Sequence, residues 1–119
     1  MQNLQDVLKF IKKRPGMYLG NSPNLPKLRD FILGYETAVF IHQINEPKFN
    51  CQFSTFVARQ LGYGESTAGF VNMILAYVIG FEPKQIDWDT FLQQSISDDE
   101  HQKAFDLFFE LVEEFWTQV

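Results

Sequence analysis

The sequence has little of what an enzyme or metal site requires. Its 119 residues include one cysteine, Cys51, and two histidines, His42 and His101, which are far apart in the chain. A single thiol excludes an internal disulfide bond and a thiolate metal cage. There is no glycine-rich phosphate loop and no Asp-x-Asp-x-Asp-Gly calcium loop. We therefore predict no catalytic residue, no metal, no cofactor and no enzymatic activity.

These three side chains also have plain structural interpretations. His42 continues an apolar helical stripe, which favours a hydrogen-bonded residue at the edge of the core. His101 stands among acids in the first turn of the last predicted helix, where we expect a solvated face. Cys51 lies in an apolar setting without a neighbouring base, so nothing indicates a nucleophile.

Long apolar runs are missing as well. No stretch of 18 apolar residues occurs, and the longest candidate, residues 70–81, is interrupted by Asn72 and Gly80. The N-terminal residues lack the basic-then-apolar layout of a signal peptide. We expect no membrane partner and a location in the cytoplasm.

What the chain does have is aromatic and helical. Thirteen phenylalanines and 45% hydrophobic residues indicate one domain, residues 1–119, with a core filled by rings. Apolar spacing predicts an all-α bundle of about six helices and no convincing strand, over residues 4–13, 25–44, 51–61, 67–79 and 88–94, with a last helix that starts at the Ser97–Glu100 capping box and extends at least to Trp116. The fourth is apolar on nearly every side, so we place it near the centre. Ser66 or Thr67 should cap it, and Gly34 in the second helix suggests close approach of another element.

One segment, residues 14–20, has a sequence that indicates a particular local structure. Pro15 and Gly16 form a good turn pair, and Pro15 disfavours a helical Arg14. Met17, Tyr18 and Leu19 would then anchor the turn to the core before Gly20 interrupts the chain. The segment is interpreted as a structural motif, with direct binding as the alternative.

Charge is distributed unevenly. Residues 1–29 hold six basic side chains and one acid, a net charge of +5, whereas residues 30–119 hold four basic and fourteen acidic ones, a net charge of −10. The acidic part would repel a phosphate backbone and attract a basic protein. The partner-binding prediction covers five acids and one aromatic anchor: Glu65, Asp87, Asp89, Asp98, Asp99 and Tyr63. Tyr63 stands between two glycines, and a ring folded back on the core is equally consistent with that position.

The segment Arg14-Pro15-Gly16-Met17-Tyr18-Leu19-Gly20, the pair Gly34-Tyr35, and the pattern of Ala104-Phe105, Phe108-Phe109 and Leu111 together resemble a group of small bacterial proteins. These are similar to immunity proteins of polymorphic-toxin and contact-dependent growth inhibition systems. The first segment also resembles one in type II topoisomerase ATPase subunits, but the downstream ATP-binding motifs of that family are missing here.

The resemblance implies a cytoplasmic protein that binds and neutralises a cognate toxin domain, expected to be a basic nuclease, in a stoichiometric complex. It supplies no catalytic residues. Two alternatives stay open. One is a regulatory or scaffold module that binds a different protein, and the other is a nucleic-acid binder that uses the basic residues between Lys9 and Arg29.

Overall fold

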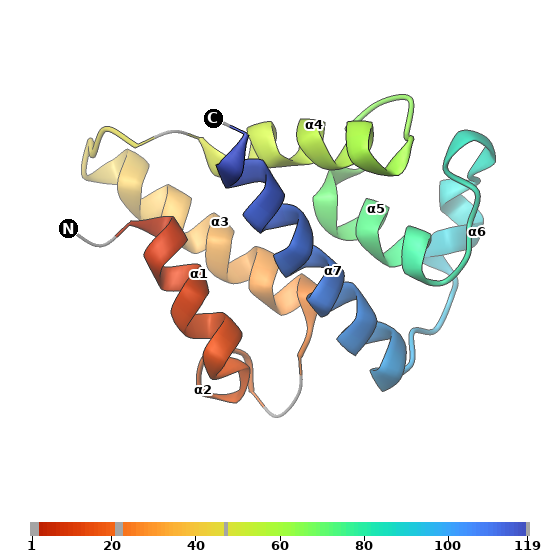
Figure 1. Ribbon diagram of the computed structural model, residues 1–119, viewed down its shortest axis with the longest axis horizontal. Helices are drawn as coiled ribbons and strands as arrows, with labels where there is room; N and C mark the ends of the chain where they lie inside the picture. The colour runs from red at the N-terminus through yellow and green to blue at the C-terminus, as the bar shows by residue number, and fades with distance from the viewer. Residues whose placement is uncertain (1–2, 21–22, 47, 119) are drawn as a thin grey trace.

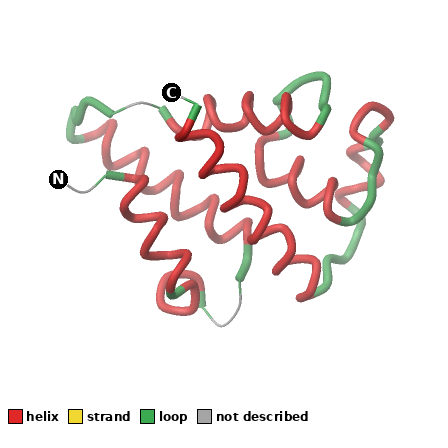
Figure 2. The backbone as a smooth tube through the Cα atoms, in the orientation of Figure 1, coloured by secondary structure: helices red, strands yellow, loops and turns green. Residues whose placement is uncertain are grey.

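Helices account for most of the described backbone. The computed structural model describes residues 3–20, 23–46 and 48–118, and no strand occurs in these ranges. In chain order the elements are α1 Leu4–Lys13, α2 Pro15–Leu19, α3 Leu25–Ile41, α4 Phe49–Leu61, α5 Gly69–Val78, the short 3-10 helix η1 Pro83–Gln85, α6 Trp88–Leu92 and α7 Asp98–Thr117 (Figures 1 and 2). The all-α prediction is confirmed, with two more short helical elements, α2 and η1, than expected.

The apolar α5 occupies the middle of the fold, as predicted. It packs mainly on α4 and α7 and also contacts α3 and η1. Its start was predicted wrongly, because neither Ser66 nor Thr67 caps it. Residue 66 instead belongs to a turn in which its carbonyl accepts a hydrogen bond from the Gly69 N–H at 3.0 Å. Gly69 has a φ of 85°, a backbone conformation that glycine adopts without strain.

Aromatic rings fill the space between α4, α5 and α7. Phe53 of α4 is fully buried and meets Phe70, Phe108 and Phe115 edge-on, with centroid distances of 5.3, 5.4 and 5.5 Å. Edge-to-face geometry places the positive rim of one ring against the negative face of the next. The expected ring-filled core is therefore present.

Polar caps define where four helices begin. Asn3, Asn24 and Asp87 each accept a hydrogen bond from a backbone N–H in the first turn of α1, α3 and α6. In α7, Ser97 and Glu100 form a reciprocal capping box, with distances of 3.2 and 3.0 Å. These caps satisfy donors that helix starts otherwise leave unpaired, and Asn, Asp and Ser are residue types that favour this position.

The segment 14–20 differs from its prediction. Residues 15–19 are helical, because Pro15 sits in the first turn of α2, where its fixed φ fits and its missing N–H is not needed. Met17 is 71% exposed, Leu19 is buried in the core, and the exposed Tyr18 contacts only the edge of the core through Phe31, at 6.2 Å between ring centroids. Gly20, with a φ of 92°, ends the helix.

Helix α3 also corrects several expectations. It ends at Ile41 rather than near residue 44, and His42 caps it as an exposed residue, not one at the core edge. No other element closely approaches Gly34, since a Cβ atom added at this position would meet nothing within 4 Å. Figure 1 shows the last turns of α3 reaching the left edge of the molecule, away from α5 and α6.

Candidate functional site

The predicted acidic residues gather at one end of the molecule. Asp87 and Asp89 lie at the start of α6, Asp98 and Asp99 at the start of α7, and Glu65 in the loop between α4 and α5. All five side chains are exposed. Figure 1 shows these three segments spread along the right-hand side of the molecule, with the loop between α4 and α5 at the top, α6 at the far right and the start of α7 at the bottom, opposite the C-terminal end of α3. We call this group of five carboxylates the acidic end.

Local structure accounts for part of this arrangement. The Asp87 carboxylate accepts hydrogen bonds from the Asp89 N–H at 3.1 Å and from the Thr90 hydroxyl at 2.9 Å. Asp98 and Asp99 stand in the first turn of α7, where the helix dipole favours negative charge. The two ion pairs found in the described ranges, Lys12–Glu113 and Arg29–Asp30, involve none of the five. Their charge is therefore directed into solvent.

The Tyr63 ring is folded back on the core, the second of the two positions that the sequence allowed. Its side chain is buried, its hydroxyl donates a 2.7 Å hydrogen bond to the Met73 carbonyl, and its ring stacks on Trp88 at 5.9 Å. Burial raises the pKa of this phenol from 10.0 to about 12. Tyr63 is therefore not displayed to a partner as an anchor. It instead holds the loop that carries Glu65 against α6.

The opposite charge lies on α1, at Arg14 between α1 and α2, and at the start of α3. Lys9, Lys13 and Arg14 are exposed. Lys12 bonds to Glu113 at 2.9 Å and stands over the Phe109 ring, with 5.8 Å between its Nζ and the ring centroid. The molecule thus separates a basic face near its N-terminus from the acidic end.

A further surface was not found from sequence. Along the outer side of α3 and just beyond it, large apolar side chains face solvent, and we call these residues the α3 strip: Leu33, Phe40, Ile41 and Ile44. Phe40 is 82% exposed and Ile41 is 65% exposed. An apolar Ile41 would be expected to broaden the buried stripe of this helix, and its exposure shows that this expectation is wrong. Residues 37–45 contain no acidic, lysine or arginine side chain. Without such charges the sequence does not show which side of this segment faces solvent.

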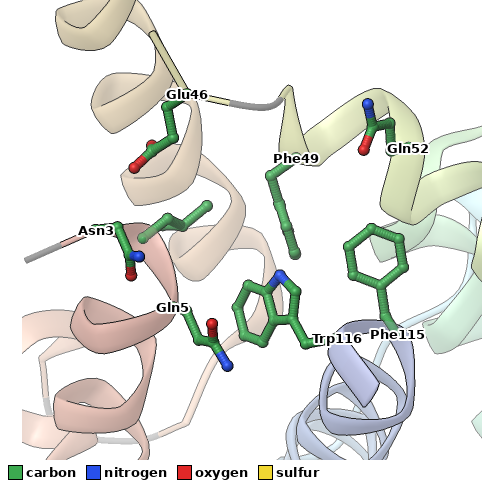
Figure 3. A pocket seen from close by; sticks show the side chains of 8 residues that line it. Asn3, Gln5, Glu46, Phe49, Gln52, Phe115 and Trp116 are labelled. Carbon is green, nitrogen blue, oxygen red and sulfur yellow. The ribbon is translucent and has the colours of Figure 1, made fainter. Parts of the chain in front are cut away.

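The structure also contains a pocket between α1, α4 and the end of α7 (Figure 3). Its volume is about 360 Å³. Leu4 and the aromatic residues Phe49, Phe115 and Trp116 supply the apolar wall, and the polar lining residues are Asn3, Gln5, Glu46 and Gln52. A pocket of this size and mixture is typical of sites for small groups.

The remaining candidates for chemistry do not come together. Cys51 is exposed rather than in an apolar setting. His101 is half-buried, not fully solvated, and its Nδ1 is buried without a hydrogen-bond partner among the described residues. Within the described ranges, no group of three His, Cys, Asp or Glu residues could hold a metal ion. No helix in the part of the chain that the structure describes is long and apolar enough to cross a membrane.

Comparison with protein-family models, with curated proteins and with solved structures finds no match to this chain. The molecule is thus defined by its own features: an all-α fold with an acidic end, an apolar strip on α3 and an aromatic pocket.

Proposed function

We propose that this protein is an immunity protein that binds a basic toxin domain, expected to be a nuclease, and neutralises it by forming a stoichiometric complex. The observation that supports this proposal is the acidic end. Three segments separated in sequence bring five exposed carboxylates to one side of the fold, and none is engaged by a basic side chain in the described ranges. The resemblance at Arg14–Gly20 and in α7 points to the same class.

The proposed mechanism needs no bond-making chemistry. A nuclease must bind a phosphate backbone, so its active-site cleft carries positive charge. Carboxylates at the acidic end would attract that cleft over long distances, raise the association rate by about 10- to 1000-fold, and then occupy the space that the substrate needs. Because Tyr63 and the helix caps hold the acidic segments in place, the carboxylates are ordered before binding.

The test pairs this protein with the toxin domain encoded by the adjacent gene. We would measure the association rate by stopped flow at low and high salt for the natural protein and for a variant carrying Glu65→Gln, Asp89→Asn, Asp98→Asn and Asp99→Asn. We expect this variant to associate about 10-fold or more slowly at low salt, with the difference shrinking as salt screens the charges.

A matched control removes the same four charges elsewhere, through Asp30→Asn, Asp106→Asn, Glu110→Gln and Glu114→Gln, which are exposed positions away from the acidic end. We expect a change of less than about 3-fold for the control. The absence of a complex with the toxin domain would refute the proposed function. Equal slowing by both variants would refute the role of the acidic end.

The α3 strip favours a second candidate, a scaffold or regulatory module that binds a different protein through an apolar contact. A phenylalanine with 82% of its surface in water is a residue that a partner commonly covers. This alternative predicts that Phe40→Ser with Ile41→Ser abolishes the complex, whereas the four substitutions at the acidic end leave it intact.

A further inference from the structure

The pocket shown in Figure 3 combines two features that recognise positive charge. The first is an aromatic wall of three rings, in which Phe115 and Trp116 are partly exposed and Phe49 is buried, stacked on Phe53 at 4.9 Å. Phe49 lies 5.9 Å from Phe115 and 5.6 Å from Trp116, and Phe115 lies 6.3 Å from Trp116, all measured between ring centroids. A cation near an aromatic face is attracted to its negative potential, most strongly at tryptophan.

The second feature is a single, positioned carboxylate. Glu46 is the only charged residue among those that line the pocket in the described part of the chain. Its Oε1 accepts a 3.0 Å hydrogen bond from the Tyr35 hydroxyl. Burial and this bond raise the pKa of Tyr35 from 10.0 to about 12, in keeping with a phenol that donates to a carboxylate. The Tyr35 hydroxyl thus orients the Glu46 carboxylate at the edge of the pocket.

The other polar groups at the rim are amides. Gln5 and Gln52 come from α1 and α4 and offer side-chain carbonyls as neutral acceptors. Figure 3 shows Gln5 and Gln52 at opposite edges of the pocket, with the side chains of Phe49, Phe115 and Trp116 between them. Flat faces, one fixed anion and several neutral acceptors suit a planar cation that carries many donors.

We propose that this pocket binds a guanidinium group, the side chain of an arginine presented by a partner polypeptide. A guanidinium stacks on aromatic rings, is weakly hydrated, and has five N–H donors to share between a carboxylate and amide carbonyls. A lysine ammonium fits less well because it is compact and strongly hydrated. The inference is independent of the toxin proposal, since it concerns a different part of the molecule.

A small probe tests the pocket directly. N-acetyl-arginine amide would be titrated into the ¹⁵N-labelled protein at low salt, and the two indole N–H signals, assigned with a Trp88→Phe variant, would be followed by NMR. We expect saturable movement of the Trp116 signal. N-acetyl-citrulline amide, which has nearly the same shape but no charge, should bind at least about 10-fold more weakly. The affinity of N-acetyl-lysine amide should lie between those of the other two probes.

Variants locate the effect. Glu46→Gln should weaken arginine binding by about 10-fold, while Gln52→Glu, which adds a carboxylate at an exposed rim position, should strengthen it several-fold. Asp99→Asn removes an equal charge at the acidic end and should change nothing. Equal binding of the arginine and citrulline probes, no movement of Trp116, or unchanged affinity in Glu46→Gln would each overturn the proposal.

Discussion

The two longest helices, α7 and α3, differ in how far their apolar side chains are buried. Helix α7, with 20 residues, buries two adjacent rows that include Phe105, Phe108 and Phe109 and turns its acids outward. Helix α3, with 17 residues, buries Leu25, Leu28 and Ile32 in its first half and then exposes Phe40 and Ile41. Hydrophobicity alone therefore does not say where a side chain lies in this protein. The difference is that α7 carries charged residues on its solvent-facing side, whereas the second half of α3 carries none after Glu36.

That difference separates stability from recognition. In α7 the apolar rows meet α4 and α5, so each ring contributes to holding the fold. In the second half of α3 the exposed apolar side chains lie outside the core cluster, so they form an apolar surface and add little to stability. The following substitutions probe the contrast between α7 and the α3 strip, beginning with the one of largest expected effect.

Phe108→Ala should lower the free energy of unfolding by about 3–5 kcal/mol, because it removes a ring with 0% exposure and leaves a cavity among other rings. Phe40→Ala, the same chemical change on the α3 strip, should change stability by less than about 0.5 kcal/mol. Urea denaturation followed by circular dichroism measures both. Phe108→Leu provides a milder core variant if Phe108→Ala does not fold, and similar costs at positions 40 and 108 would show that the α3 strip is packed.

A pH titration compares a tyrosine of the core with one of α3. The folded protein raises the pKa of Tyr63 from 10.0 to about 12, so the unfolded chain loses this proton first and stability falls as pH rises through that window. From about pH 9 to about pH 11.5, Tyr63 should account for a loss of roughly 2 kcal/mol. Tyr63→Phe should therefore flatten the decline in unfolding free energy.

Tyr35 on α3 has a pKa raised in the same direction, but its side chain is only half-buried. Tyr35→Phe should flatten the alkaline decline less than Tyr63→Phe does, because solvent screens the phenolate there. Thermal melts at a series of pH values measure both slopes. An equal or larger effect at Tyr35 would contradict the comparison.

The sequence predicted the elements of this fold better than their exposure. Helical spacing, the caps at Asn3 and Ser97, and the central α5 follow from local rules that act within a few residues. The outward position of Phe40 could not be read in this way, because it depends on which parts of α3 the other helices cover after folding. The pocket was missed for the same reason, since Glu46 and Trp116 meet only after folding.

Gly34→Ala should raise the free energy of unfolding by about 0.5–1 kcal/mol. The residue lies inside α3 without a positive φ, and the added methyl group would meet nothing within 4 Å. Alanine also restricts the unfolded chain more than glycine does. Urea denaturation gives the sign, and Gly62→Ala is the matched control, because its φ of 87° should make the same change destabilising. Destabilisation by Gly34→Ala would mean that another surface closely approaches this face of α3.

The smallest effect is expected from the outer face of α7, where Lys12 reaches across from α1 to Glu113 at 2.9 Å. Both side chains are largely exposed, so the pair should contribute less than about 1 kcal/mol and lose most of that at high salt. Glu113→Gln should therefore lower stability slightly at low ionic strength and not measurably in about 1 M salt. Glu114→Gln, the neighbouring exposed acid, serves as the control and should have no such salt dependence. A large, salt-independent loss in Glu113→Gln would show that polar contacts on this face, and not only the buried rings behind it, hold α1 against α7.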